Sequence, residues 1–312
     1  MSVRIGYMPG AFGQGGEDPD YLRQLVAVGD KNGYDSIWLS DRIVSDRFSL
    51  EPIVALSMVA ALSPVMKFGT SVLALPLRNP VVLAKQIATL DFLSKGRMLP
   101  AVGLGQEEPE EYEACGVSME DRGPRTEEAI RLMRRLWEED DVTHEGDFFT
   151  CHNVTITPTP CFTPSPPVWI GGRSHAAARR VGRVGDGWMV SSATPEEISE
   201  GRDIVFGTAE EHQREIEDDH IGVILGYYIS PNASSNIEDT VNKAHNYVTR
   251  HRPDVHFTEY SALGSAEKVV ETIHRYVEAG AYKFVVRPLC PAEETVEQLD
   301  ILGSEVLPQV TT

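Results

Sequence analysis

One stretch of the chain, PPVWIGGRSHAAARR at residues 166–180, places a glycine turn, an arginine and a helix start together. Gly171 and Gly172 end an apolar strand-like run, and Arg173 and Ser174 follow directly. Glycine lets the backbone approach a ligand closely. A serine cap leaves the first N–H groups of a helix pointing outwards, where the helix dipole adds roughly half a positive charge. This pattern predicts a phosphate-binding turn through Gly172, Arg173 and Ser174. The alternative is an ordinary turn whose arginines face water.

A second pair of charged residues follows the strand-like run SIWLS at 36–40. Asp41 and Arg42 could pair with each other on the surface, which would contribute little stability. They could instead direct a carboxylate and a guanidinium into a pocket. We favour the second interpretation because both residues stand at the end of a strand.

A third polar segment, GLGQEEPEEYEACG, follows the strand-like run at 97–105. Glu107 and Glu108 are candidates for a carboxylate pair in acid–base catalysis. Three further glutamates continue the run: Glu110, Glu111 and Glu113. We therefore interpret the segment as a solvated acidic start of a helix. Gln106, next to the glycine turn, is the better candidate for a pocket residue.

Other kinds of catalytic site have weak support in the sequence. The nine histidines include no H-x-x-x-H pair and no cluster with carboxylates at ligand spacing, so we predict no metal site. No G-x-S-x-G motif indicates a hydrolase.

The elements that must position these residues alternate between strand and helix patterns. Eight strand-like runs are found at 3–8, 36–40, 67–75, 97–105, 167–172, 186–190, 221–230 and 283–288. Helical patterns between them predict an α/β fold, an (αβ)8 TIM barrel. In such a barrel the chemistry lies at the carboxyl ends of the strands, which favours the phosphate interpretation of Gly172, Arg173 and Ser174. A doubly wound open sheet is the alternative, but no G-x-G-x-x-G follows the first strand.

An insertion interrupts the alternation between the fourth and fifth strands. Glu145-Gly146-Asp147 stands between β-prone arms and predicts a hairpin. The proline-dense stretch TPTPCFTPSPP follows it. Because the strand–helix alternation then resumes, we expect one domain over residues 1–312.

Composition restricts the possible partners. Only 28 Lys and Arg stand against 47 Asp and Glu, a formal net charge of −19, which disfavours nucleic acid and anionic membranes. No apolar run is long enough to span a membrane, and the N-terminus lacks a signal-peptide core. Four scattered cysteines indicate reduced thiols, and we expect a cytoplasmic protein.

Six blocks of the sequence, among them GYDSIWLSDR and PVWIGGRSHAAARRVGRVGDGW, resemble the bacterial luciferase-like superfamily. The resemblance runs from about residue 3 to 305 and is strongest to the oxidoreductases that use the deazaflavin coenzyme F420. It implies an (αβ)8 barrel, a homodimer, and reduced F420 or FMN as cofactor. It also implies a small-molecule substrate.

The resemblance assigns roles to particular positions. Gly172, Arg173 and Ser174 would bind the cofactor phosphate, and Asp41 would contact the deazaflavin ring system. A cis peptide bond between Ser71 and Val72 would form a bulge behind the ring. These roles are implied by the resemblance alone.

The sequence also departs from this family at three positions. Arg42 stands where related dehydrogenases carry histidine, and Gln106 stands where they carry glutamate, so two titrating groups are missing. Leu104, before Gly105, stands where FMN-using luciferases place an arginine. These changes favour F420 and hydride transfer from its C5 atom to a carbonyl, imine or activated alkene. Arg42 would then polarise the acceptor and Gln106 would donate or accept a hydrogen bond. An FMN-dependent monooxygenase and a non-catalytic cofactor-binding protein are the alternatives.

Overall fold

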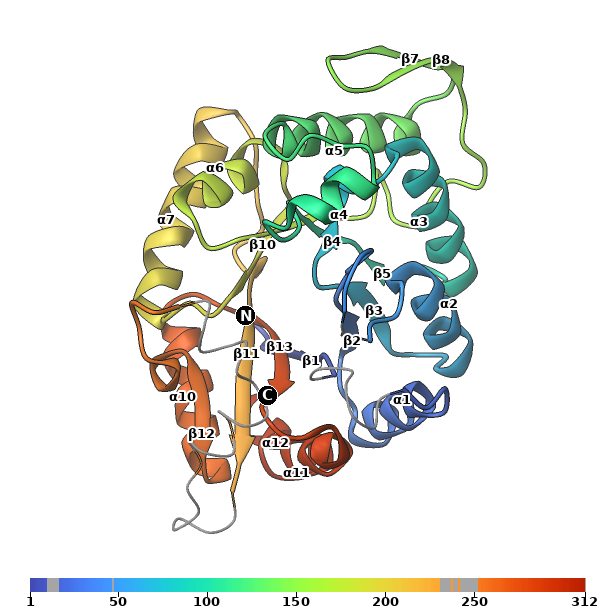
Figure 1. Cartoon of the computed structure of the whole chain (residues 1–312). Coiled ribbons are helices and arrows are strands. Elements are labelled where there is room, and N and C mark those ends of the chain that lie inside the picture. Colours follow the sequence, from blue (N-terminus) through green and yellow to red (C-terminus); the bar gives the residue numbers. More distant parts are fainter. Residues whose placement is uncertain (10–16, 47, 231–236, 238–240, 242–251, 312) are drawn as a thin grey trace.

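The computed structural model describes residues 1–9, 17–46, 48–230, 237, 241 and 252–311. Its main sheet is parallel and occupies eight strand positions around a ring (Figure 1). In chain order the strands are β1 (Arg4–Tyr7), β2 (Ser36–Leu39), β3 (Lys67–Thr70) with β4 (Leu73–Ala74), β5 (Met98–Leu99) with β6 (Ala101–Gly103), β9 (Trp169–Gly171), β10 (Gly187–Ser191), β11 (Ile221–Ile229) and β13 (Lys283–Pro288).

Strand pairing closes this sheet. β3 and β4 are the two halves of the third strand, and β5 and β6 are the halves of the fourth. β3 pairs with β5 and also with β2, while β4 pairs with β6, which in turn pairs with β9. β13 pairs with both β1 and β11 on the other side of the ring. The predicted barrel is therefore confirmed, with all eight strands near their predicted positions.

Helices surround the strands in Figure 1. They are α1 (Tyr21–Asn32), α2 (Pro52–Leu62), α3 (Pro80–Ser94), α5 (Arg122–Glu138), α6 (His175–Val184), α7 (Pro195–Glu211), α10 (Ala266–Glu278) and α11 (Thr295–Glu305). Shorter elements are η1 (Leu75–Leu77), α4 (Pro109–Ala114), η2 (Phe257–Glu259), η3 (Ala292–Glu294) and α12 (Leu307–Val310), with strand β12 (Ser261–Gly264) beside β11.

Local capping explains where several of these helices begin. Asn79 accepts hydrogen bonds from the N–H groups of Val81 and Val82 at the start of α3, with Pro80 in the first position. Thr194 and Glu197 form a capping box at the start of α7. Each cap fixes the point at which the chain leaves a strand-end loop and becomes helical.

The predicted hairpin is also confirmed. β7 (Val142–Glu145) and β8 (Thr150–Val154) pair antiparallel, outside the barrel and close to α5 in Figure 1. They form a separate two-stranded sheet, which leaves the barrel strands undisturbed.

Bulky side chains fill the barrel. Trp38 and Trp169 lie in one buried cluster with Met189 and Val285, so both tryptophans are core residues. All four cysteines are unpaired, as predicted. No helix among the described residues is both long enough and apolar enough to cross a bilayer.

Candidate functional site

The phosphate-type turn has the geometry that its sequence predicts. Gly172 has φ +126°, a conformation that other residues rarely adopt, and a Cβ there would lie 2.8 Å from the Cβ of Ala177. Ser174 caps α6 by accepting a hydrogen bond from Ala177 N at 3.2 Å. Trp188 donates from Nε1 to Gly172 O at 2.8 Å, which fixes the turn to the neighbouring strand. The exposed Arg173 therefore stands beside a rigid, glycine-containing helix start.

Arg180 of this stretch and Arg183 just after it have structural partners. Arg180 and Arg183 both pair with Glu127 of α5, at 3.4 Å and 2.5 Å. The surface interpretation holds for Arg179, which is exposed. Arg173 is therefore the arginine of this stretch that the fold leaves at the strand end.

A buried arginine that sequence reasoning missed supports the same turn. Arg252 has a side chain only 2% exposed and pairs with Glu197 at 2.6 Å and with Asp254 at 2.7 Å. It also donates to Ser192 O at 2.8 Å, the oxygen that Arg173 reaches at 3.3 Å. No local pattern around Arg252 marks it, because Glu197 and Ser192 lie far away in the sequence.

The third strand carries the predicted cis peptide bond, between Ser71 and Val72. Ser71 is buried, and its Oγ has no hydrogen-bond partner among the described residues. Such an orphaned hydroxyl is uncommon in a folded protein.

Two glycines make room for the side chain of Val72. A Cβ added at Gly103 would lie 2.6 Å from Val72 Cγ2, and one at Gly171 would lie 2.8 Å from Val72 Cγ1. Strands β4, β6 and β9 thus converge on Val72. Ser71 and the turn at Gly172 are in this way parts of one region at the carboxyl end of the barrel.

Asp41 lies beneath the surface of this region. Its carboxylate accepts from Ala74 N at 2.9 Å and pairs with Arg78 at 2.8 Å, and its side chain is fully buried. Burial raises the pKa of Asp41, while Arg78 opposes that rise. Arg78 also pairs with Glu51 at 2.8 Å. Asp41 therefore fixes the chain just after Val72, and Arg78 has a structural role.

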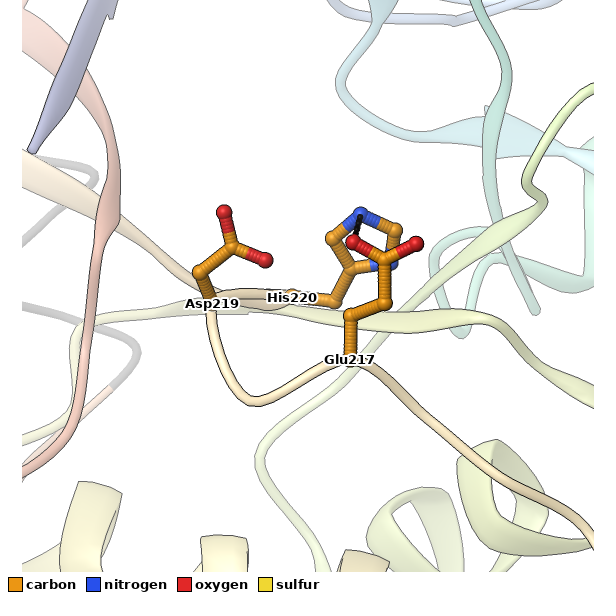
Figure 2. Close-up of side chains that lie close together, drawn as sticks. All are labelled: Glu217, Asp219 and His220. Carbon is orange, nitrogen blue, oxygen red and sulfur yellow. Dashed lines mark ion pairs between the residues drawn. The ribbon is translucent and has the colours of Figure 1, made fainter. Parts of the chain in front are cut away.

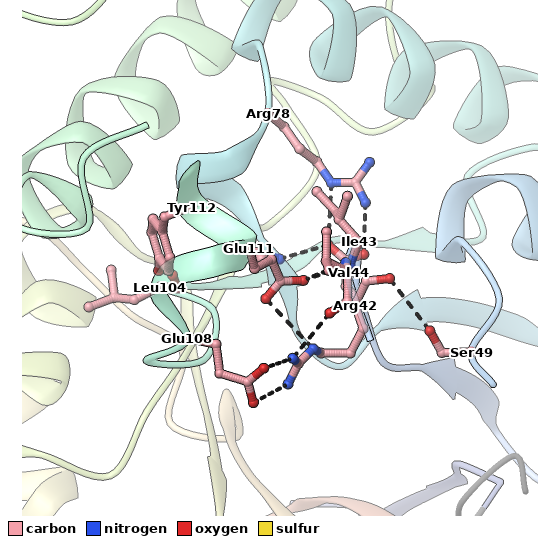
Figure 3. Close-up of polar contacts among 11 residues, drawn as sticks. Arg42, Ile43, Val44, Ser49, Arg78, Leu104, Glu108, Glu111 and Tyr112 are labelled. Atoms are coloured by element: carbon pink, nitrogen blue, oxygen red, sulfur yellow. Dashed lines mark hydrogen bonds and ion pairs between the residues drawn. The ribbon is translucent and has the colours of Figure 1, made fainter. Parts of the chain in front are cut away.

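Arg42 is held by two carboxylates from the segment after β6 (Figure 3). Its Nη2 lies 2.5 Å from Glu108 Oε2, and its Nε lies 3.6 Å from Glu111 Oε2. The expectation of a uniformly solvated acidic face was wrong at Glu111, which is 1% exposed. Two backbone N–H groups, of Ile43 and Val44, donate to its other oxygen and compensate for its burial.

The turn after β6 is also held in place by a side chain of α4. Tyr112 donates a hydrogen bond from its hydroxyl to Leu104 O. Gly105 has φ +85° and lies next to Ala74 and Tyr112. Gln106 is partly buried at the same turn. It lies two residues before Glu108, which pairs with Arg42.

The amino-terminal ends of the strands form a second region, at the opposite end of the barrel. A cavity of about 540 Å³ lies there, with Trp38, Trp169 and the buried Lys283 in its wall. Lys283 Nζ donates a hydrogen bond to the carboxylate of Asp35 and another, at 2.7 Å, to Ser36 Oγ.

One group of metal-binding residue types lies at the same end. Glu217, Asp219 and His220 have ligand atoms within 4.8 Å of one another (Figure 2). Arg4 already pairs with Asp219 at 2.9 Å, and His220 Nδ1 contacts Asp186 O at 2.7 Å. Because a cation would have to displace Arg4, we assign no metal to this group.

Known proteins share both the sequence pattern and the architecture. Two F420-dependent glucose-6-phosphate dehydrogenases are similar. The protein from Kineococcus radiotolerans is 33% identical over 56% of this chain and 53% of its own length. The protein from Intrasporangium calvum is 28% identical over 93% of this chain and 94% of its own length. This chain therefore spans about half the length of the first relative and nearly all of the second.

A solved structure of an F420-dependent secondary alcohol dehydrogenase, in complex with an F420-acetone adduct, has the same fold. Its TM-score is 0.84 at 24% identity, and all of both chains is covered. The family of luciferase-like monooxygenases matches residues 4–283, which is most of the chain. With the closed barrel and the strand-end site in place, the chain belongs to the luciferase-like monooxygenase family.

Proposed function

We propose that the protein is an F420-dependent oxidoreductase acting on a small organic substrate. The observation that carries this proposal is the packing of Val72 against Gly171, directly before the phosphate-type turn. It brings the Ser71-Val72 segment of the third strand and the turn at Gly172 together in one region. The names of the two relatives above, both F420-dependent dehydrogenases, support the same cofactor.

The residues present fit this cofactor. Gly172, Arg173 and Ser174 would hold a phosphate group through free N–H groups and one positive charge. Ser71 Oγ, which lacks a partner among the described residues, would bind a polar atom of the ring system. Asp41 has a fully buried side chain, so instead of contacting the ring system directly, as expected from the resemblance, it would hold the segment after Val72 in place through Ala74 N.

When bound, reduced F420 supplies a hydride from C5. Arg42 would stabilise the negative charge that develops on the acceptor, since a guanidinium stays protonated near neutral pH. Gln106 would orient the acceptor through its amide. Because neither residue can take up a proton as a general base, we propose reduction of a carbonyl, imine or activated alkene, with the anion formed by hydride addition taking its proton from solvent water.

Cofactor titration tests the assignment. Purified protein is titrated with F420 and with FMN in parallel, and binding is followed by fluorescence. Anaerobic oxidation of reduced F420 is then measured with panels of carbonyl, imine and alkene acceptors. Tight FMN binding without F420 binding would overturn the proposal, and substrate-dependent oxygen uptake would indicate a monooxygenase. F420 binding without turnover of any acceptor would support a non-catalytic binding protein.

We also propose that the protein forms a homodimer through α2 and α3. α2 contains no charged residue, and Val54 on its outer face is 72% exposed. On α3, Phe92 and Leu93 are 54% and 71% exposed. A groove of about 510 Å³ between the two helices is lined by residues of both. A helix that is apolar on all sides is normally buried, and a second copy of this face would bury it.

A further inference from the structure

Two neighbouring residues of the short helix α4 have buried side chains that contact different loops. Glu111 and Tyr112 are each only 1% exposed, whereas Glu110 and Glu113 face solvent. Glu111 reaches the loop after β2, and Tyr112 reaches the loop after β6 (Figure 3). α4 therefore joins the two loops that carry Arg42 and Gln106.

The contacts of Glu111 are directional. Oε1 accepts from Ile43 N at 2.7 Å and from Val44 N at 3.1 Å. Oε2 faces Arg42 Nε at 3.6 Å. A carboxylate that accepts two backbone N–H groups has little freedom to rotate, so it fixes both the loop and the charge that faces the guanidinium.

Glu108 differs from Glu111 in its surroundings. It pairs with Arg42 at 2.5 Å, but its side chain is 54% exposed. A half-exposed carboxylate on a loop can rearrange when an acceptor arrives, since surface ion pairs are weak. Glu111 is buried and anchored, so it is the partner that can keep Arg42 in place during a reaction.

We propose that Glu111 is a positioning residue: it fixes the 42–44 loop and aims the guanidinium of Arg42 at the acceptor. This inference rests on the proposed function, in which Arg42 polarises the acceptor. Without Glu111, Arg42 would pair with Glu108 alone, and its guanidinium would move towards solvent and away from the acceptor.

Amide hydrogen exchange tests the loop contact without any substrate. Glu111→Ala removes the acceptor that Ile43 N and Val44 N share, so the segment 40–46 should exchange about tenfold faster or more. Glu111→Gln keeps an oxygen for these N–H groups and should restore most of the protection. Glu110→Ala, on the exposed face of the same helix, is the matched control and should exchange like the wild type.

Kinetics with the best acceptor of the panel test the effect on Arg42. Glu111→Gln removes the charge facing Nε, so kcat should fall roughly tenfold while the Kd for F420 stays unchanged. In an Arg42→Met background the same change should have no further effect on kcat, because Glu111 acts through Arg42. Additive losses in the double variant, or a matching loss of F420 affinity, would overturn the proposal.

The cofactor and the contact of Glu111 with the 42–44 loop can be tested separately. If the wild type neither binds F420 nor oxidises it with any acceptor, the proposed function is wrong. The exchange measurement then decides the role of Glu111 alone. Unchanged exchange of the segment 40–46 in Glu111→Ala would show that Glu111 does not hold this loop.

Discussion

The side chain of Val72 lies directly over Gly171, where an added Cβ would come within 2.8 Å of Val72 Cγ1. The third strand and the phosphate-type turn are therefore sterically coupled. A side chain at Gly171 would push Val72, Gly172 or both out of position.

The substitution Gly171→Ala tests this coupling. We expect the Kd for F420 to rise at least about tenfold, since the added Cβ would overlap the branched side chain of Val72, which Gly103 also borders closely. Val72→Ala in the same chain should restore part of the affinity by removing the opposing methyl groups. Gly207→Ala is the control: a Cβ at Gly207 would meet no atom within 4 Å, and α7 should gain up to about 1 kcal/mol. Equal F420 affinity of Gly171→Ala and wild type would contradict the coupling.

The hydroxyl of Ser71 should affect stability and binding in opposite directions. It is buried without a partner among the described residues, so Ser71→Ala should leave the free energy of unfolding unchanged or raise it by up to about 1 kcal/mol. The Kd for F420 should rise roughly fivefold, because a hydrogen bond to the cofactor is lost. Urea unfolding and fluorescence titration measure the two quantities.

Ser36 provides the matched control for Ser71. Its Oγ is buried but accepts from Trp38 Nε1 at 2.8 Å and from Lys283 Nζ at 2.7 Å. Ser36→Ala should therefore destabilise the fold by about 1–3 kcal/mol and leave F420 affinity unchanged. A lower stability of Ser71→Ala of the same size would show that its hydroxyl has a partner.

Arg173 should contribute a charge-assisted contact to the cofactor phosphate. Arg173→Ala should raise the Kd for F420 roughly tenfold to a hundredfold, with a smaller effect at high salt. Arg179→Ala, at an exposed arginine of the helix α6 that follows the turn, changes the net charge equally and should have little effect. Indistinguishable affinities of the two variants would remove Arg173 from the phosphate site.

Lys283 should make stability depend on pH in the alkaline range. Burial lowers the pKa of Lys283 from 10.5 to about 8, against the opposing effect of Asp35. Between pH 8 and pH 10.5, Lys283 keeps its proton in the unfolded chain but has released it in the folded chain. The free energy of unfolding therefore rises with pH in this range. From pH 8 to 9.5 the rise should reach about 2 kcal/mol relative to the Asp35→Asn/Lys283→Met double variant. Parallel pH profiles of the two proteins, from urea unfolding, would contradict this assignment.

The apolar face of α2 and α3 should decide the oligomeric state. Leu93→Glu places a charge on that face and should convert the dimer to a monomer, as measured by light scattering after size exclusion. Gln309→Glu adds the same charge at an exposed position of α12 and should leave the mass unchanged. A wild type that is monomeric at all concentrations would overturn the proposed dimer.

Local patterns were sufficient for the barrel strands and the hairpin of this fold. The period of the apolar residues predicts all eight barrel strands, and Glu145-Gly146-Asp147 predicts the hairpin between β7 and β8. Ser174 as the cap of α6 follows from its place between glycines and a helical run. These features depend on neighbours within a few residues, which is why the sequence contains them.

Long-range contacts decided the roles of the charged residues. Glu111 and Glu110 are adjacent and chemically identical, yet Glu111 is buried because the N–H groups of Ile43 and Val44, 68 and 67 residues away, donate to its carboxylate. Arg78 has its partner Asp41 37 residues away, and Arg252 has Glu197 at a separation of 55. The burial of a charge depends on what the fold packs against it, so only the tertiary structure separates positioning residues from surface charge.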